Sequence, residues 1–158
     1  MARIPRSGRV LDLACGSGRH TRLLFERGYQ VLAVDRNAVA LAGLQGLPGV
    51  TTAELELEGS DWPLAGQSFA GIVVTNYLWR PRLNDLLALL APGGVLIYET
   101  FMLGNAAYGK PSNPDFLLRP GELREIAAAA GLREVAFNAG YTEFPKPAMC
   151  QAICAVRD

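Results

Sequence analysis

The sequence predicts an α/β fold, a doubly wound sheet of about seven strands that is mostly parallel with the last strand antiparallel. Short β-branched runs alternate with longer helical patterns, which is typical of a parallel sheet covered by helices on both faces. The most continuously apolar run, residues 70–75, indicates a central strand buried on both faces. The length of 158 residues suits one domain, and we expect residues 1–158 to form it.

The first elements are a strand, a helix and a second strand. Residues 9–14 (RVLDLA) predict the first strand. Residues 17–27 (SGRHTRLLFER) predict a helix that ends at Gly28, because glycine readily adopts the left-handed conformation of a helix end. Residues 29–34 (YQVLAV) predict the second strand.

A short helix and an edge strand come next. Residues 37–44 predict the helix, with Asn37 as its N-cap. Residues 50–57 (VTTAELEL) alternate between apolar and polar side chains, as in a half-exposed strand nearer one edge of the sheet. Residues 59–67 form a turn-rich loop before the central strand.

A helix and another strand follow the central strand. Residues 81–90 (PRLNDLLALL) predict a helix, since proline is tolerated in the first turn. The Pro-Gly-Gly of residues 92–94 is a strong stop signal, so we expect the next strand to cover residues 95–100.

The last part of the chain predicts a lid, a helix and a hairpin. Residues 101–119 show little periodicity and predict a long loop or lid. Residues 121–130 predict a helix, which Gly131 ends. Residues 133–141 and 149–156 predict two strands, and they should be antiparallel because no helix lies between them.

Composition excludes several classes of protein. The 15 Lys and Arg balance the 15 Asp and Glu, so no basic excess is available to neutralise a nucleic acid backbone. No stretch approaches the ~18 to 20 apolar residues that span a bilayer, and residues 1–9 lack a signal-peptide core. We therefore expect a cytoplasmic protein with neither a nucleic acid nor a membrane as partner.

The cysteines and the histidine indicate neither a disulfide framework nor a metal site. Cys15, Cys150 and Cys154 are an odd set, and the last two lie too far apart to bridge if they share a strand. Their spacing with His20 matches no zinc motif, so we expect no metal. No His or basic partner is placed to activate Cys15, which we expect to pack beneath the turn.

The most informative segment is residues 10–18 (VLDLACGSG), a strand that runs into a small, glycine-bearing turn before a helix. Such a turn lets the backbone approach a ligand closely, where a side chain would obstruct it. Asp35 follows the second strand, seventeen residues after Gly18. In an open α/β sheet an acid there lies beside the first turn and can accept hydrogen bonds from both hydroxyls of a ribose. The spacing makes these two features one predicted nucleotide site.

A nicotinamide dinucleotide is the obvious competing ligand. Its fingerprint is G-x-G-x-x-G or A after the first strand, and no alignment of residues 14–21 satisfies that pattern. Asp12, just before the turn, would repel a pyrophosphate but suits a cationic amino group. A nicotinamide-dependent dehydrogenase is therefore the less favoured hypothesis.

Four segments in order resemble the class I S-adenosylmethionine-dependent methyltransferases, small-molecule type, whose fold is Rossmann-like. Residues 12–18 (DLACGSG) look like the D-x-G-x-G-x-G loop of that family, with Ala14 in place of the first glycine, and Asp35 looks like its ribose acid. Residues 62–69 (WPLAGQSF) resemble its L-P-F…S-F-D segment, although Ala70 replaces the acid. Residues 90–96 (LAPGGVL) are similar to its turn into the fifth strand. Residues 115–123 (DFLLRPGEL) also resemble small-molecule members of the family.

The resemblance implies S-adenosyl-L-methionine as cofactor and a binding role for several residues. It assigns Asp12 and the Ala14 carbonyl to the methionine amino group, and Gly16 and Gly18 to close approach around methionine and ribose. It assigns Asp35 to the ribose hydroxyls. The remaining implied contacts are Arg36 or Asn37 beside the adenosine, and Asn76 with Tyr77 beneath the sulfonium.

The acid that would meet the adenine edge stays open among four residues. Glu54, Glu56, Glu58 and Asp61 lie close together after the third strand. We favour Glu56 with the backbone N–H of Leu57, because this pair should stand at the strand end, and Glu58 with Gly59 is the second choice.

The implied reaction is an in-line displacement of the sulfonium methyl by a nucleophile of a small-molecule acceptor. Alignment supplies most of the acceleration for so good a leaving group, so a dedicated base is optional. Candidate catalytic residues are Glu99, Tyr98, Tyr77 and Tyr108, and Trp79 and Asn113 are further candidates to shape the acceptor pocket.

A second hypothesis is a non-catalytic domain that binds S-adenosylmethionine and transfers nothing. Only eight residues precede the first-strand segment, whereas the family usually has an N-terminal helical segment that helps cover the cofactor. The departures at Ala14 and Ala70 point the same way. A partner chain, as in a homodimer, would be another way to cover the site.

Overall fold

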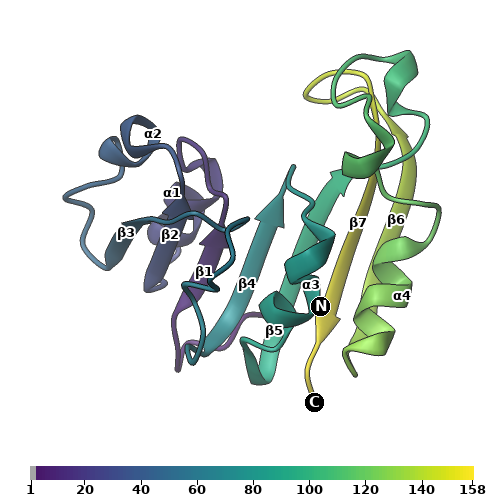
Figure 1. Cartoon of the computed structure of the whole chain (residues 1–158). Helices are drawn as coiled ribbons and strands as arrows, with labels where there is room; N and C mark the ends of the chain where they lie inside the picture. The colour runs from purple at the N-terminus through teal and green to yellow at the C-terminus, as the bar shows by residue number, and fades with distance from the viewer. Residues whose placement is uncertain (1–2) are drawn as a thin grey trace.

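A computed structural model describes residues 3–158, which form one seven-stranded sheet in the order β3-β2-β1-β4-β5-β7-β6 (Figure 1). All neighbouring strands are parallel except the pairs that involve β7, which is antiparallel to both β5 and β6. The expected fold class and the antiparallel last strand are thereby confirmed. The strands are β1 (Val10–Leu13), β2 (Val31–Asp35), β3 (Val50–Glu54), β4 (Phe69–Thr75), β5 (Leu90–Phe101), β6 (Arg133–Thr142) and β7 (Ala148–Val156).

Helices cover both faces of the sheet. In Figure 1, α3 and α4 lie in front of the strands and α1 lies behind them. The helices are α1 (Arg19–Glu26), α2 (Ala38–Ala42), α3 (Leu83–Leu87) and α4 (Glu122–Ala129), and the short 3₁₀ turns are η1 (Arg80–Arg82), η2 (Asn105–Ala107) and η3 (Pro114–Phe116). No helix in this described part of the chain is long and apolar enough to cross a membrane.

The side-chain alternation of β1 divides the core between the two faces. Leu11 belongs to the larger apolar cluster, which includes Leu86 of α3 and Leu123 of α4. Its neighbour Val10 belongs to a second cluster, with Leu24 of α1. Because successive side chains of a strand point to opposite faces, β1 is buried on both sides and anchors the middle of the sheet.

Local signals in the sequence set most element ends. Gly28 follows α1 with a φ of 81°, as expected for a left-handed helix stop. Asn37 caps α2, because its side-chain oxygen accepts hydrogen bonds from the amides of Val39 and Ala40 at 3.0 and 3.2 Å. The N-cap prediction is confirmed.

Several boundaries differ from the expectation, among them that of the helix predicted over residues 81–90, of which α3 covers only Leu83–Leu87. Two of the differences have a clear physical reason. β3 ends at Glu54, three residues before the predicted end at residue 57, because its partner strand β2 ends at Asp35, which pairs with Glu54. The Pro-Gly-Gly of residues 92–94 belongs to β5 and does not stand between helix and strand. The reason is pairing: the amide of Gly93 donates to the carbonyl of Arg157, and the Arg157 amide donates to Gly94, at 2.5 and 3.0 Å.

The packing around Ala70 explains why this chain lacks the acid that the family pattern has at this position. Ala70 is buried, and a β-carbon added to Gly8 would stand 3.0 Å from the Ala70 side chain. The Ala70 amide donates to the carbonyl of Arg9 at 2.8 Å, so the strand is closely packed against the segment before β1. A carboxylate at this position would be buried in an apolar cluster, which is unfavourable without a partner.

The segment predicted as a lid is anchored. Asn105 of η2 is buried; its side-chain amide donates to the Pro111 carbonyl at 2.9 Å, and its oxygen accepts from the Met149 amide at 3.0 Å. Met102 and Leu118 form a parallel bridge across the base of the segment. These contacts hold the segment above the ends of β5 and β7, as Figure 1 shows.

An ion pair ties the far end of this segment to α4. The Arg80 guanidinium donates to both oxygens of the buried Glu122 carboxylate, at 2.8 and 2.9 Å, and also to the carbonyls of Asp115 and Leu117. The hydrogen bonds from Arg80 hold the pKa of the Glu122 carboxyl below its ordinary value, against the effect of burial. A single arginine therefore holds η1, η3 and α4 together.

We expect the Arg80–Glu122 pair to make the fold sensitive to acid. A lowered pKa in the folded state stabilises the protein above the unfolded value of about 4.3, and this stabilisation is lost as the pH falls through the folded value. Glu122→Gln should therefore lower the melting temperature at pH 7 and flatten its decline below about pH 4. Thermal unfolding between pH 7 and 3 measures both effects, and parallel curves for the two proteins would contradict this role.

Candidate functional site

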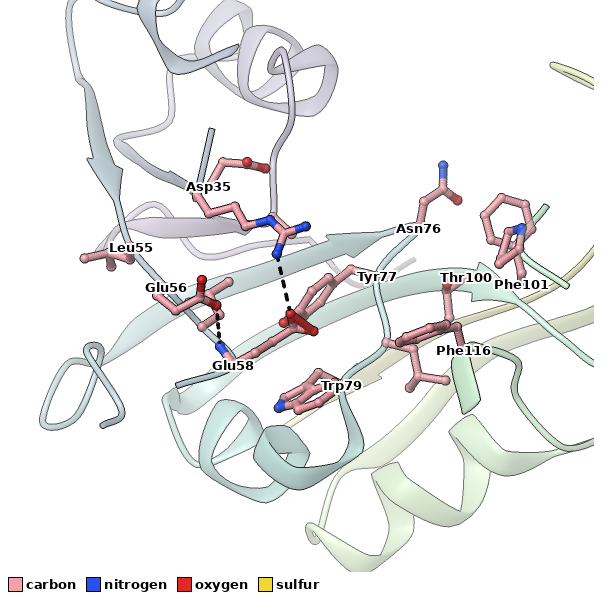
Figure 2. A pocket seen from close by; sticks show the side chains of 15 residues that line it. Asp35, Leu55, Glu56, Glu58, Asn76, Tyr77, Trp79, Thr100, Phe101 and Phe116 are labelled. Atoms are coloured by element: carbon pink, nitrogen blue, oxygen red, sulfur yellow. Dashed lines mark hydrogen bonds and ion pairs between the residues drawn. The ribbon is translucent and has the colours of Figure 1, made fainter. Parts of the chain in front are cut away.

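A cavity with a volume of about 680 Å³ opens at the carboxyl ends of the parallel strands. It lies where ligands bind in open α/β sheets. Figure 2 shows Asp35 and Glu56 on one side of this cofactor cavity, Asn76 and Phe101 on the other, and Tyr77 between them. The lining residues are Ala14, Asp35, Arg36, Leu55, Glu56, Leu57, Glu58, Asn76, Tyr77, Leu78, Trp79, Thr100, Phe101, Pro111 and Phe116.

The turn after β1 brings three predicted residues to this edge, each in the left-handed conformation. Ala14 lines the cavity with a φ of 52°, a strained value for a residue with a β-carbon. Gly16, at 57°, has no atom within 4 Å of where a β-carbon would stand. Gly18, at 89°, is packed so closely that a β-carbon would lie 2.4 Å from Leu44. Gly18 thus serves packing, while Gly16 leaves open space.

Asp35 connects that turn to the end of β2. One carboxylate oxygen accepts from the Gly16 amide at 2.9 Å, and the other accepts from the Asn37 amide at 2.9 Å. The carboxylate is half-buried and lines the cavity. Two backbone donors therefore orient it, and its remaining lone pairs are available to a ligand.

The structure separates the four candidate acids at and after the end of β3. Glu56 and Glu58 line the cavity, whereas Glu54 and Asp61 are exposed and do not. A side-chain oxygen of Glu56 accepts from the backbone N–H of Glu58 at 3.0 Å, which closes a tight turn. A guanidinium nitrogen of Arg36 lies 4.0 Å from a carboxylate oxygen of Glu58. Arg36 lines the cavity, but Asn37 does not, because its side chain caps α2.

Asn76 and Tyr77 follow β4 and both line the cavity. Asn76 has a φ of 57°, and its backbone N–H donates to the carbonyl of Glu99 at 2.9 Å. Burial raises the pKa of Tyr77. Tyr98 is fully buried, and its hydroxyl donates to the Tyr77 carbonyl at 2.7 Å, so it supports the cavity floor and does not face a ligand.

The other candidate acceptor residues are dispersed. Trp79 lines the cofactor cavity, while Glu99 lines a second, smaller cavity beside it. Tyr108 lines neither; its ring packs on Tyr141 at 5.2 Å between centroids. Asn113 also lines neither, because its side chain caps η3.

Sequence reasoning missed the residues that close the cavity from the side of β5. Thr100, Phe101, Pro111 and Phe116 line it, and the last two come from the anchored segment. Thr100 directly follows Glu99 in β5, so its position at the strand end was a usable signal. Nothing local marks Pro111 or Phe116, since their placement depends on tertiary contacts such as the Asn105 hydrogen bond.

Two further groups lie beneath the turn. Asp12 is buried, accepts from the Thr21 hydroxyl at 2.6 Å and does not line the cavity; burial raises the pKa of its carboxyl. Burial also raises the pKa of the Cys15 thiol to about 12, with a contribution from the nearby Asp12. Cys15 therefore stays a neutral thiol near pH 7, as a packing residue would.

The fold and the site together define a Rossmann-like nucleotide-binding domain, with a glycine-bearing turn after β1 and an oriented acid after β2. Residues 10–94 match the family described as "Methyltransferase domain". This match covers more than half of the sequence, so the chain belongs to the S-adenosylmethionine-dependent methyltransferase family.

Curated proteins resemble the chain in sequence. Trans-aconitate 2-methyltransferase of Azoarcus sp. is 36% identical over 148 residues, which cover 86% of this chain and 54% of that protein. Alignments with two further curated relatives cover 49% and 52% of the length of those proteins. The chain therefore spans about half the length of the curated relatives it matches.

Two solved structures show the same fold. TehB from Haemophilus influenzae superimposes with a TM-score of 0.79 at 21% identity, covering 96% of this chain and 58% of that one. Burkholderia thailandensis 1,6-didemethyltoxoflavin-N1-methyltransferase, solved with bound 1,6-didemethyltoxoflavin and S-adenosylhomocysteine, gives a TM-score of 0.69 at 22% identity and covers 96% of this chain and 72% of that one. At these identities the likeness concerns the fold alone.

The glycines of the turn should differ in what an added methyl group does to stability. We expect Gly16→Ala to lower the free energy of unfolding by about 1 kcal/mol, from left-handed strain alone. Gly18→Ala should lower it by about 2 to 4 kcal/mol, because strain is joined by a clash with Leu44. Denaturant titration measures both values; equal losses would show that Leu44 moves aside freely.

Proposed function

We propose that this domain transfers the methyl group of S-adenosyl-L-methionine to a small-molecule acceptor. The observation that carries the proposal is the Asp35 carboxylate, held by the Gly16 and Asn37 amides at the rim of a 680 Å³ cavity. An acid so oriented after the second strand suits the two hydroxyls of a ribose.

The charges around the cavity suit a cationic ligand. Asp35, Glu56 and Glu58 line it, against one arginine, Arg36. S-Adenosylmethionine carries a sulfonium and an amino group, which an acidic lining attracts, whereas the pyrophosphate of a dinucleotide would be repelled. This balance also argues against the nicotinamide alternative.

Each part of the cofactor has matching residues in this proposal. Asp35 would bind the ribose, and Glu56 with the Leu57 amide would bind the adenine edge, with Glu58 as the alternative. Asp12 and the Ala14 carbonyl would attract the methionine amino group, since the buried Asp12 carboxylate has only a neutral hydroxyl as its side-chain partner among the described residues. Further predicted contacts are Gly16, Gly18, Arg36, Asn76 and Tyr77.

When bound, the cofactor supplies a sulfonium-activated methyl group. The chain's own contribution is to align the acceptor with that group and to exclude water, which can supply most of the acceleration. The aromatic faces of Tyr77, Trp79 and Phe116 line the cavity and suit a neighbouring cationic methyl group.

Calorimetric titration with S-adenosylmethionine tests the binding step. We expect saturable binding that Asp35→Asn weakens by about 10- to 100-fold, because charge-assisted hydrogen bonds to the ribose are lost. Asp61→Asn is the matched control, since Asp61 is exposed and lines no part of the cavity. Binding of NADH without binding of S-adenosylmethionine would overturn the proposal.

Release of S-adenosylhomocysteine over a panel of small acceptors tests transfer itself. Product that depends on one acceptor class is the expected result. Tight cofactor binding with no product from any acceptor would favour the second hypothesis, a binding domain that transfers nothing.

A further inference from the structure

A second cavity, of about 70 Å³, lies directly beside the cofactor cavity and shares Asn76 and Phe101 with it. Strand ends form its floor, through Thr75 of β4 and Glu99 of β5. The hairpin between β6 and β7 contributes the outer wall, together with Arg19 at the start of α1. A group bound there would be a neighbour of whatever occupies the larger cavity, with Asn76 at the junction.

The two cavities have opposite charge balance. Arg19 and Lys146 line the second cavity against a single acid, Glu99, whereas three acids and one arginine line the first. Within residues 3–158, no carboxylate lies within ion-pairing distance of Arg19 or Lys146. The only side-chain hydrogen bond of Arg19 in that range is to the ring of its neighbour His20, at 3.2 Å. Unpaired cations at the wall of a hollow attract an anion.

The titratable groups nearby favour an acceptor that arrives already deprotonated. Burial keeps Cys15 and Tyr77 protonated near pH 7, because it raises the pKa of both. Tyr98 already donates its proton to a carbonyl, and His20, the sole histidine, lines neither cavity. Burial also raises the pKa of Cys150, which lines the second cavity. The other titratable acids that line the two cavities are carboxylates, and a carboxylate is too weak a base to deprotonate an alcohol or an amide.

We propose that the second cavity binds the acceptor, and that the acceptor is a small carboxylic acid in its anionic form, held by Arg19 and Lys146. This inference rests on the function proposed above. An acceptor carboxylate oxygen attacks the methyl carbon, a C–O bond forms, the C–S bond breaks, and its electron pair stays on sulfur. The products are a methyl ester with one negative charge fewer than the acid and an uncharged thioether, so no proton moves and no base is required. The esterified group has lost the charge that the two cations attract, which favours release of the ester.

Binding can be measured apart from transfer, by calorimetric titration of succinate, citrate and benzoate into protein saturated with S-adenosylhomocysteine. We expect at least one of these anions to bind, and the Arg19→Gln/Lys146→Gln double variant to bind it at least ten-fold more weakly. Glu99→Gln should bind it more tightly, because a like charge is removed. Arg27→Gln is the matched control, since Arg27 is exposed just beyond the opposite end of α1. Arg19 and Lys146 are themselves exposed, so thermal unfolding should be unchanged in the double variant.

The chemical identity of the product gives a second readout. Methyl esters release methanol in alkali, so label from methyl-labelled S-adenosylmethionine should become volatile after alkaline treatment. The inference is overturned if no acid of the panel binds the wild-type complex, if the double variant binds equally well, or if no bound acid yields an alkali-labile product. Failure to bind S-adenosylhomocysteine at all would instead overturn the proposed function on which this inference rests.

Discussion

The site depends on the parallel pairing of β1 with β2, which sets Leu13 opposite Val34. Both strands reach the same edge of the sheet in step, and the hydrogen bond from the Gly16 amide to Asp35 can then form at 2.9 Å. Burial of β1 on both faces holds this register, because a slip of one residue would exchange the side chains of its two faces. The position of Asp35, the acid proposed to bind the ribose, is thus decided by apolar packing in the middle of the sheet.

Backbone strain gathers at the same edge. Ala14 after β1 and Asn76 after β4 are the non-glycine residues with positive φ in the described chain, and both line the cofactor cavity. Each carries a conformational cost of roughly 1 kcal/mol, which surrounding contacts must offset. For Asn76 one such contact is its bond to the Glu99 carbonyl, which also joins the ends of β4 and β5. The strain lets the backbone turn sharply at two places on the lining of the cavity.

Local sequence signals were sufficient for the order of elements, the Asn37 cap and the Gly28 stop, because each depends on residues a few positions apart. The Pro-Gly-Gly of residues 92–94 was misassigned, since its pairing with Arg157 is decided by residues more than sixty positions away. The same holds for the site: Asp35 and the turn were found from spacing, whereas Phe116, Arg19 and Lys146 reach their cavities through tertiary structure. The four candidate acids could not be separated by pattern, because the chain beyond Glu54 leaves the ladder, and the turn that joins Glu56 to the Glu58 amide brings these two to the cavity.

The antiparallel β7 places the hairpin after β6 at the same edge of the sheet as the nucleotide site. A hairpin loop can change length and composition without disturbing the ladder that it closes. Residues 143–147 contribute no lining to the cofactor cavity, yet they form one wall of the second cavity. If the second cavity binds the acceptor as proposed, exchange of this loop would change the acceptor without altering the residues around Asp35, so one sheet could serve many substrates.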